Sequence, residues 1–377
     1  MKCLFITNGY LNENSGGVYA TKAYINAFAS LSESLTLVYA AKEGMDVARI
    51  FDDNVKMIPI LDNRSKLRKF VELCLGIVNR FQKNLFDYID IKDYDTVIFN
   101  NSDVSSGLIK RVKQYGLKVI TIHHNYQIEY IIGDSSKLLL LPLLVWTFIY
   151  EGIAVRHSDL NLTLTEQDID LLKKHYGGSH YDVIGVFEYE QLQKNENEES
   201  IRGHHYVITG WLGSKQTEDS LIPWIKNYYP LLKKIDPLAE LTIAGRNPSE
   251  QLCILAQSAG IKVIASPVDM QPILNSADYY ICPTDRGGGL KLRNMDGLKS
   301  GLSVLTHLVS ARGYEYMQNL GIVRPYYDAD SFISGIQALL SSNKSKNDII
   351  VEYQNYYSLD AGIRRLEKIL KKWQPIF

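Results

Sequence analysis

The sequence predicts an α/β protein of two domains, and three features of the chain carry that prediction. Short apolar runs alternate with helical segments along almost the whole length, which is the pattern of sheets covered by helices. At 377 residues the chain is longer than a single hydrophobic core usually supports. The polar run 191–203, with QKNENEES at its centre, interrupts the alternation and is predicted to link the two domains.

In the first half, strands and helices are expected to alternate from the first residues onward. The strands are predicted at Lys2–Thr7, Leu35–Tyr39, Lys56–Ile60, Thr96–Asn100, Lys118–His123 and Leu160–Leu164. The helices are predicted at Gly17–Leu31, Arg64–Phe86, Ser105–Tyr115, Leu138–Arg156 and Glu166–Tyr176. Thr165 and Asp168 form a capping pattern at the start of the last of these helices.

The second half repeats the alternation and ends in a helix. Its strands are predicted at Tyr206–Gly210, Leu241–Gly245, Lys262–Ala265, Tyr279–Cys282, Ser303–Thr306 and Gly321–Val323. The last helix, Ala361–Trp373, is amphipathic and basic. The acidic pair in Asp328-Ala329-Asp330 opens a helix and is expected to cap it rather than to bind a metal.

Composition excludes several classes of protein. The net charge of −1 gives no whole-chain basic excess, so a nucleic-acid partner is not expected. The four cysteines are widely scattered, which suggests neither a zinc cluster nor a disulfide framework and fits a reducing compartment. The opening MKCLFITNGYL lacks the long apolar region and the cleavage site of a signal peptide. A cytoplasmic location is therefore expected.

The segment Cys282–Thr306 carries the strongest functional signal. Gly287-Gly288-Gly289 follow an apolar strand and allow the backbone to approach a ligand without Cβ atoms in the way. Lys291 and Arg293 are expected in the first turn of the next helix, where free N–H groups already favour an anion. Asp296 lies one turn further on and can accept hydrogen bonds from a ribose diol. These residues predict a site for a diphosphate attached to a sugar.

A second glycine loop, Gly16-Gly17, lies between the first strand and the first helix. Ligands of doubly wound sheets bind at this edge. The loop does not match the dinucleotide fingerprint G-x-G-x-x-G, and no acidic residue ends the strand Leu35–Tyr39, so a nicotinamide cofactor is not expected. A simple strand-to-helix turn is the alternative interpretation.

The adjacent histidines His123 and His124 end a strand at the same edge of the sheet. Zinc requires three or four ligands, and no further Cys or His lies at a ligand spacing, so no metal site is expected. A structural histidine at the end of the strand remains the alternative to a role in the reaction.

The run GGGLKLRNMDGLKSGLSVLTHLVSARGYE resembles the donor-binding motif of retaining glycosyltransferases of the GT-B fold, especially family 4. By that resemblance Lys291 meets the donor diphosphate, and Asp296 holds the ribose hydroxyls where the family usually has Glu. The family's second carboxylate falls on Gly288, so its role is absent or is taken by Asp285. The resemblance implies a catalytic set and a donor-binding set. The catalytic set is His124, Lys291 and Asp285; the donor-binding set is Gly16, Gly17, Gly210, Lys215, Gly245, Arg246, Gly288, Gly289, Leu290, Lys291, Arg293 and Asp296.

The pattern H-N-x-x-E resembles the family loop in which a histidine reaches the transferred sugar. It assigns His124 to the sugar and places Asn125 and Glu129 on the acceptor side. An exposed surface lysine is the alternative for Lys215. The resemblance covers nearly the entire chain and is weaker before residue 120.

The resemblance implies the GT-B fold, in which two Rossmann-like doubly wound domains face a cleft. The first domain is expected at 1–190, the linker at 191–203 and the donor domain at 204–358, with the helix of 359–377 packing back on the first domain. It also implies transfer of a hexose-like sugar from a UDP- or GDP-type sugar to a hydroxyl acceptor, with retention and without metal or cofactor. The expected acceptor is a carbohydrate, a lipid-linked glycan or a glycoprotein in surface glycan, polysaccharide or glycoconjugate synthesis.

Two alternative functions are compatible with the same motifs. A non-hydrolysing epimerase would use the same donor pocket but requires several catalytic carboxylates and histidines that the sequence does not reveal. A catalytically inactive GT-B scaffold that binds a glycan or a partner transferase is supported by Asp296 and Gly288 at the family's carboxylate positions.

Two segments bear on membrane contact. Asn63–Phe86 combines six cations with many apolar residues, a pattern that can lie on an anionic bilayer or form a solvated helix packed on the sheet. Leu138–Tyr150 is apolar but too short to span a bilayer, so we expect a buried core helix, with docking at a membrane interface as the alternative. A peripheral contact with the inner face of the membrane therefore stays open.

Overall fold

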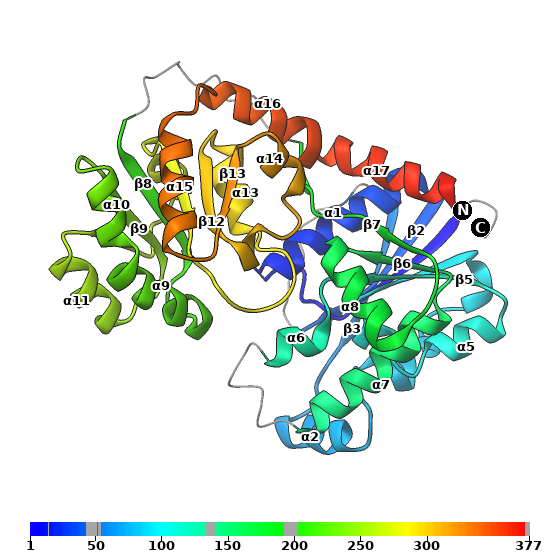
Figure 1. Cartoon of the computed structure of the whole chain (residues 1–377). Coiled ribbons are helices and arrows are strands. Elements are labelled where there is room, and N and C mark those ends of the chain that lie inside the picture. The colour runs from blue at the N-terminus through cyan, green and yellow to red at the C-terminus, as the bar shows by residue number, and fades with distance from the viewer. Residues whose placement is uncertain (14, 43–50, 52–53, 133–140, 192–202, 374–377) are drawn as a thin grey trace. The chain divides into compact units, whose positions relative to one another are not determined.

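The α/β class is confirmed by a computed structural model that describes residues 1–13, 15–42, 51, 54–132, 141–191 and 203–373 (Figure 1). The chain forms two compact units. Unit 1 comprises Met1–Leu192 with Tyr357–Phe377, and unit 2 comprises Gln193–Tyr356. The predicted linker 191–203 lies almost entirely outside the described residues.

Unit 1 is built on a parallel sheet with the strand order β3-β2-β1-β4-β5-β6-β7. The strands are β1 (Lys2–Thr7), β2 (Ser34–Ala41), β3 (Val55–Leu61), β4 (Thr96–Asn100), β5 (Lys118–His123), β6 (Leu160–Thr163) and β7 (Tyr181–Val183). The first six match the predicted strands to within two residues. The seventh strand, β7, was not predicted from the sequence because it is only three residues long.

Both faces of this sheet are covered, as its apolar strands require. Leu4 and Ile6 of β1 point into a cluster that includes Val104, Leu108 and Val112 from the segments after β4. On the opposite face Phe5 packs against Phe28, with ring centroids 6.1 Å apart. The helices are α1 (Gly16–Leu31), α2 (Lys66–Cys74), α3 (Phe81–Asn84), α4 (Ser102–Ser105), α5 (Ile109–Gln114), α6 (Gln127–Ile132), α7 (Leu141–His157), α8 (Glu166–Tyr176) and α17 (Leu359–Lys372).

The single helix predicted at Arg64–Phe86 is wrong, because a glycine ends it early. Gly76 has φ +80°, and its N–H donates to Leu73 O while the Ile77 N–H donates to Glu72 O. These two bonds form the motif that closes a helix after a left-handed glycine. The chain resumes as α3 and a short 3-10 turn, Leu85–Asp87. The helix predicted at Ser105–Tyr115 is shorter than expected: it corresponds to α5 (Ile109–Gln114), and the separate α4 ends at Ser105.

The buried core helix predicted for Leu138–Tyr150 is also wrong over the residues that the structure describes. In α7 the fully buried residues are confined to its second half, from Glu151 to Val155. Its first half leaves Leu141, Val145, Phe148 and Ile149 exposed. Residues 138–140 lie outside the described part of the chain.

The last helix, α17, packs on α1, which confirms the expected return of the C-terminal helix to the first domain (Figure 1). Gly362 lets α17 also approach Phe187, because a Cβ at this position would lie 2.2 Å from the Phe187 ring. Arg365 donates to Ile184 O at 2.8 Å and fixes the helix to the end of the sheet.

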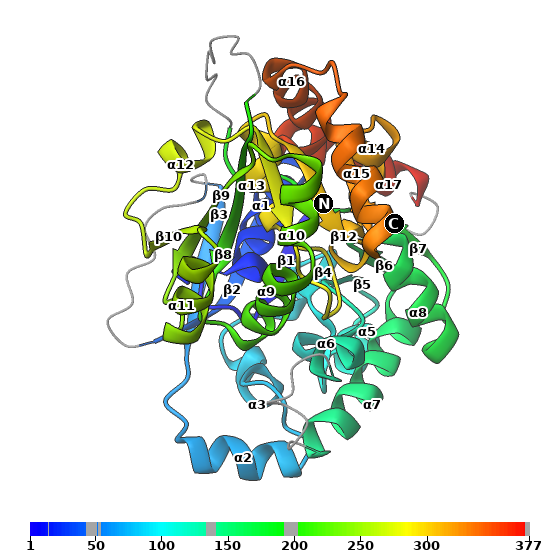
Figure 2. The same cartoon turned by 60° about the vertical axis from the view of Figure 1, so that its left-hand side comes forward.

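Unit 2 contains a second parallel sheet with the order β10-β9-β8-β11-β12-β13. The strands are β8 (His205–Trp211), β9 (Glu240–Arg246), β10 (Lys262–Ala265), β11 (Tyr279–Cys282), β12 (Ser303–His307) and β13 (Val323–Tyr326). The helices are α9 (Lys215–Asn227), α10 (Tyr229–Ile235), α11 (Glu250–Ser258), α12 (Gln271–Asn275), α13 (Arg293–Lys299), α14 (Glu315–Asn319), α15 (Ala329–Leu340) and α16 (Lys346–Tyr357). Figure 2 shows α9, α10 and α11 beside the strands β8 and β9.

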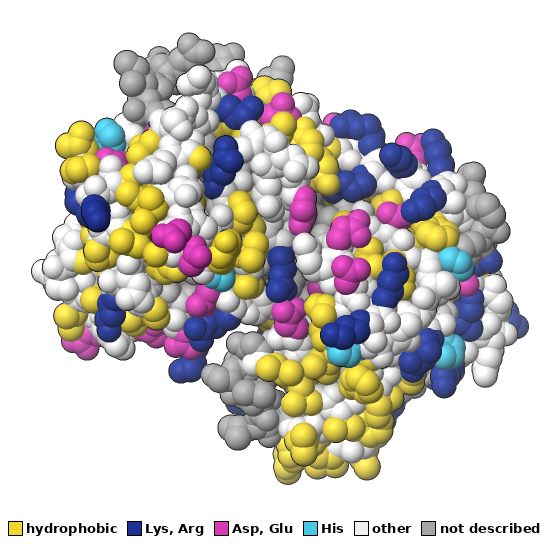
Figure 3. All heavy atoms as spheres, viewed as in Figure 1, with side chains coloured by type: hydrophobic (Ala, Val, Ile, Leu, Met, Phe, Trp, Pro, Cys, Tyr) yellow, Lys and Arg dark blue, Asp and Glu magenta, His cyan; other side chains and the backbone are white. Residues whose placement is uncertain are grey.

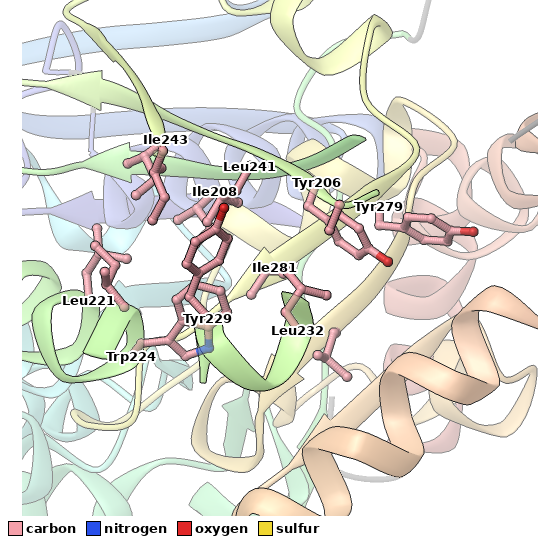
Figure 4. Packing of buried hydrophobic residues seen from close by; sticks show 14 of the residues in the cluster. Tyr206, Ile208, Leu221, Trp224, Tyr229, Leu232, Leu241, Ile243, Tyr279 and Ile281 are labelled. Carbon is pink, nitrogen blue, oxygen red and sulfur yellow. The ribbon is translucent and has the colours of Figure 1, made fainter. Parts of the chain in front are cut away.

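The core of unit 2 lies between this sheet and the helices α9, α10 and α15. Ile208, Ile243 and Ile281 from three strands meet Trp224 of α9 (Figure 4). Tyr206 and Tyr279, on neighbouring strands, stack with centroids 4.9 Å apart.

The strand predicted at Gly321–Val323 begins two residues later. Gly321 has φ +71°, and the Ile322 N–H donates to Met317 O, so both residues close α14 instead of opening β13. Asp328 caps α15 by accepting from the Ser331 N–H, which is the capping role expected for it.

Two glycines offer a matched test of packing against α7. Gly76 and Gly116 both have left-handed φ, so alanine at either should cost about 1–2 kcal/mol in backbone strain. A Cβ on Gly76 would also lie 2.9 Å from the Trp146 ring, whereas one on Gly116 meets open space. We expect Gly76→Ala to lower the free energy of unfolding by at least about 1 kcal/mol more than Gly116→Ala in urea denaturation. Equal losses would show that Trp146 moves aside freely.

Candidate functional site

The site in unit 2 lies where the strand order reverses. β8 is flanked by β9 on one side and β11 on the other, so the loops after β8 and β11 leave the same edge in opposite directions. In open α/β sheets this edge is where ligands bind. Gly210, at the end of β8, and the glycine loop after β11 are therefore brought together as predicted.

Arg293 lies at the centre of this edge. Its guanidinium nitrogens donate to Thr284 Oγ1 and to Thr217 Oγ1, each at 3.2 Å. A Cβ added to Gly210, whose φ is +146°, would lie 3.1 Å from the guanidinium carbon. The glycine therefore leaves room for the cation beside the strand end, and two buried hydroxyls fix the orientation of the cation.

Gly245 is the second glycine predicted at this edge, and the close approach of the Gly210 backbone explains why it is glycine. A Cβ on Gly245 would lie 1.8 Å from Gly210 O, so only glycine fits at the end of β9. Its neighbour Arg246 is exposed at the last position of β9. Lys215 is exposed at the first position of α9, directly after the capping residue Ser214.

The glycine loop is shaped by two left-handed residues. Gly287 has φ +83° and Gly289 has φ +69°. A side chain on Gly287 would collide with Gln216, whose amide donates to Arg286 O at 2.8 Å. Gly288 is buried and Leu290 is half-buried.

Lys291 lies before the helix and not in its first turn, which corrects the sequence expectation. The left-handed Gly289 extends the loop, so α13 begins at Arg293, and Asp296 lies in its first turn. Lys291 Nζ donates to Gly288 O at 3.1 Å, and Lys291 O accepts from the Tyr314 hydroxyl at 2.9 Å. Its ammonium group therefore lies against the glycine loop.

Asp285 is held as a carboxylate beside this loop. It accepts hydrogen bonds from Ser220 at 2.7 Å and from Arg286 at 2.9 Å. Partial burial alone would raise the pKa of Asp285, but the hydrogen bonds from Arg286 and Ser220 outweigh it and leave the pKa below its usual value. An ionised Asp285 can orient neighbours or accept a proton, but it does not supply one at neutral pH.

Most of the residues that hold this edge in place were not predicted from the sequence. Thr217, Ser220 and Gln216 lie on α9 at helical spacing, and they contact Arg293, Asp285 and Arg286 respectively. His307 ends β12 and caps the following turn through Nδ1; burial lowers its pKa. The sequence feature that could have predicted these α9 residues is the run of polar residues directly after the Gly210 turn.

In unit 1 the Gly16-Gly17 loop opens α1, as expected. Ser15 caps the helix by accepting from the Val18 N–H at 3.4 Å. Both glycines are exposed, and a Cβ on Gly17 would meet no atom within 4 Å. Contacts within the described chain therefore do not require glycine at position 17, so its backbone is open to an outside group.

His124 lies at the carboxyl end of β5, and a series of hydrogen bonds at the same edge of the sheet holds its ring. Its Nε2 is 2.8 Å from Asn100 Oδ1, while Asn100 Nδ2 donates to Thr7 and Thr21. Because the Asn100 amide nitrogen serves the two threonines, its oxygen must accept, and His124 carries its proton on Nε2. Burial lowers the pKa of His124 to about 4, so the ring is neutral at pH 7. His123 is fully buried and contacts Asn161 at 3.0 Å.

The two residues predicted for the acceptor side follow in the next turn. Asn125 is half-buried, and its Oδ1 has no hydrogen-bond partner within the described chain. Glu129 is half-buried on α6. Gln127, between them, was missed; its side chain donates to Asn101 Oδ1 at 2.9 Å, and Asn101 has a φ of +96°.

The buried carboxyl group of Glu151 is hydrogen-bonded to the backbone of this loop. Glu151 of α7 accepts from the Gln127 N–H and from the Tyr176 hydroxyl, both at 3.0 Å. Burial raises the pKa of Glu151 to about 8. Among the residues that the structure describes, no group of three or more His, Cys, Asp and Glu side chains is placed to hold a metal ion.

Comparison with known proteins finds a family model that matches most of unit 2. Residues 204–342 match the model of the family described as glycosyl transferases group 1. The chain is 23% identical over 314 residues to an uncharacterized 44.6 kDa protein in the cps region of Klebsiella pneumoniae, covering 78% of this chain and 72% of the relative.

Two solved structures are similar over the full length of this chain. Sucrose-phosphate synthase from Thermosynechococcus elongatus has a TM-score of 0.68 at 11% identity, with 100% of both chains covered. An E. coli structure described as trehalose-6-phosphate bound with UDP-2-fluoro glucose has a TM-score of 0.62 at 9% identity, again with 100% of both chains covered. These likenesses confirm the GT-B fold.

The raised pKa of Glu151 predicts a pH-dependent stability. The folded state binds the proton more tightly than the unfolded state, so the free energy of unfolding should fall as pH rises from about 4.5 toward about 8. Glu151→Gln keeps an acceptor for Gln127 but does not titrate. At about 1.4 kcal/mol per pKa unit, the wild type should lose a few kcal/mol relative to this variant over that range in thermal or urea denaturation. Parallel pH profiles would contradict a raised pKa.

Proposed function

Because unit 2 matches the group 1 glycosyl transferases within a GT-B fold, we propose that the protein moves a sugar from a nucleoside diphosphate sugar to a hydroxyl acceptor. The observation that carries this proposal is the match over residues 204–342, which contain Gly210, the glycine loop and Arg293 at one sheet edge. The bound UDP-sugar analogue in the similar E. coli structure supports a donor of this class.

Arg293 is the cation best placed for the donor diphosphate. Its guanidinium is oriented by Thr217 and Thr284 beside the bare backbone of Gly210. Guanidinium presents a planar fork of donors that matches phosphate oxygens, and its fixed orientation lowers the entropy lost on binding. Lys291 adds a second cation at the glycine loop, and Asp296 is assigned to the ribose hydroxyls.

Stabilisation of the leaving group follows from the same residues. When the bond between sugar and phosphate breaks, negative charge grows on the diphosphate, and cations that are already oriented stabilise that charge without reorganisation. This chemistry can proceed without a metal. Retention of configuration is inferred from the resemblance to family 4, in which the leaving phosphate helps to deprotonate the incoming hydroxyl.

His124 is proposed to contact the transferred sugar. The neutral ring carries a proton on Nε2, which Asn100 accepts, so Nδ1 is an acceptor suited to a sugar hydroxyl. Asn125 Oδ1 offers a second acceptor nearby in sequence. The acceptor molecule is proposed to be a carbohydrate, a lipid-linked glycan or a glycoprotein in surface glycan or polysaccharide synthesis.

An inactive scaffold of the same fold is the second candidate. Gly288 is buried in the loop where the family has a carboxylate, and Asp285 is engaged by Ser220 and Arg286. Incubation of pure protein with a panel of nucleotide sugars separates the two functions, because a transferase should slowly release free nucleoside diphosphate even without acceptor. Binding of a nucleoside diphosphate with no release from any sugar donor would favour the scaffold.

Substitution of the two loop cations tests the donor site. Arg293→Ala and Lys291→Ala should each weaken the binding of UDP or GDP about ten- to hundredfold in titration calorimetry, because hydrogen bonds to charged groups contribute about 1.5–3 kcal/mol. Arg293→Lys should recover only part of the loss, since the planar fork is absent. Lys226→Ala removes an exposed charge at the far end of α9 and should change affinity less than twofold. Unchanged affinity in Arg293→Ala would remove this residue from the donor site.

His124→Ala tests the sugar contact. A group that acts mainly as the glycosidic bond breaks lowers turnover more than binding, so nucleotide affinity should stay within a few-fold while sugar transfer or donor hydrolysis falls about a hundredfold. The exposed His175→Ala serves as the control histidine of unit 1 and should retain both. Equal loss of nucleotide binding and turnover would instead assign His124 a folding role.

A further inference from the structure

An exposed apolar surface on unit 1 plays no part in the site described above. In α2 the residues Leu67, Phe70 and Val71, with Leu75 directly after the helix, are all exposed. Their spacing places them on one side of a helix. A helix that packed this side against the sheet would bury these residues, yet the one buried residue of α2 is Glu72.

The exposed half of α7 continues this surface. Leu141, Val145, Phe148 and Ile149 recur at intervals of four, three and one, which again defines one side of a helix. We call the eight exposed apolar residues of α2, Leu75 and α7 the α2–α7 face. Figure 3 shows hydrophobic side chains gathered at the lower end of unit 1, where Figures 1 and 2 place α2 and the start of α7.

The two helices are joined by specific contacts, so the α2–α7 face is one surface. The Tyr150 hydroxyl of α7 donates to Gly76 O at 2.6 Å, directly after α2. The Trp146 ring lies so close to Gly76 that no Cβ would fit between them. Trp146 and Tyr150 stack with centroids 5.6 Å apart, and both side chains contact Gly76.

Cations line the α2 side of this face, and the carboxylates among them are buried. From Asp62 to Phe86 the chain has six Lys and Arg residues against two carboxylates. Both carboxylates are buried in ion pairs: Asp62 contacts Arg64 and Lys69, and Glu72 contacts Arg64, Arg68 and Lys83. Hydrogen bonds from these cations lower the pKa of Glu72 to about 2, so it stays ionised. Lys66, Arg68, Lys69 and Lys83 are exposed, and because the six cations outnumber the two carboxylates, this side of the face carries a net positive charge.

This combination selects one kind of occupant. Apolar side chains in the middle of a basic surface match the acyl and headgroup layers of an anionic bilayer, which can satisfy both at once. A second copy of the chain fits poorly, because a symmetric interface would bring the same cations together. Within the described residues no helix is long and apolar enough to cross a membrane, so the face would lie on the lipid rather than enter it as a span.

We propose that the α2–α7 face docks unit 1 on the surface of an anionic lipid bilayer. The apolar residues of α2 and α7 insert at the level of the headgroups, and Lys66, Arg68, Lys69 and Lys83 pair with lipid phosphates. This proposal does not depend on sugar transfer. An inactive scaffold with the same face would bind lipid equally.

Sedimentation with vesicles tests the proposal on the full chain. Wild-type protein should bind vesicles that contain phosphatidylglycerol and phosphatidylcholine at least tenfold more tightly than pure phosphatidylcholine, and added salt should weaken the binding. The quadruple variant Leu67→Ser, Leu75→Ser, Leu141→Ser, Val145→Ser should bind at least tenfold more weakly. Lys66→Glu alone should weaken binding about tenfold at low salt.

Matched controls separate docking from folding and from general stickiness. Leu238→Ser with Ile254→Ser removes two equally exposed apolar residues from unit 2 and should leave vesicle binding unchanged. All variants should keep wild-type circular dichroism and nucleoside diphosphate affinity. Vesicle binding by the quadruple variant at the wild-type level would overturn the proposal. A concentration-dependent dimer in sedimentation velocity that the quadruple variant abolishes would also overturn it and would assign the face to a second copy.

Discussion

The backbone contact between Gly210 and Gly245 is the constraint on which the proposed donor edge of unit 2 depends. With 1.8 Å between a notional Cβ on Gly245 and Gly210 O, the ends of β8 and β9 approach more closely than any side chain allows. The chain then turns into α9 at Ser214, which brings Thr217 and Ser220 to the same edge. These hydroxyls orient Arg293 and Asp285. A few glycines thus determine where the charged groups lie, although the glycines carry no chemistry themselves.

Unit 1 uses a different device at the corresponding edge of its sheet. Asn100 connects His124 to Thr7 and Thr21 through one amide group, so residues from β1, α1, β4 and β5 fix the imidazole. Burial lowers the pKa of His124 and raises that of Glu151, so both side chains are neutral near pH 7. The edge of unit 2 therefore carries the cations Arg293 and Lys291, whereas His124 and Glu151 at the edge of unit 1 are neutral.

The sequence predicted most strands because buried parallel strands are short continuous apolar runs, a signal that needs no knowledge of partners. Prediction from the sequence failed where contacts between distant segments determine the local structure. Gly76 adopts a left-handed conformation next to the Trp146 ring and ends α2. Gly321 also has a left-handed φ and closes α14 instead of opening a strand. The motif predicted Arg293, Lys291 and Asp296, but Thr217, which orients Arg293, comes from a segment distant in sequence. The hydrophobicity of α7 suggested burial, and hydrophobicity alone cannot report which side of a helix meets the protein.

The return of α17 to unit 1 has a consequence for biosynthesis. Unit 2 is one uninterrupted stretch of chain, whereas unit 1 is completed by a helix that follows unit 2 in sequence. A ribosome therefore releases all of unit 2 before α17 can cover α1 and the Phe187 side chain. Until then unit 1 leaves part of its apolar surface uncovered, while unit 2 can already finish folding. Unit 2 can therefore complete its fold before unit 1, although unit 1 begins first along the chain.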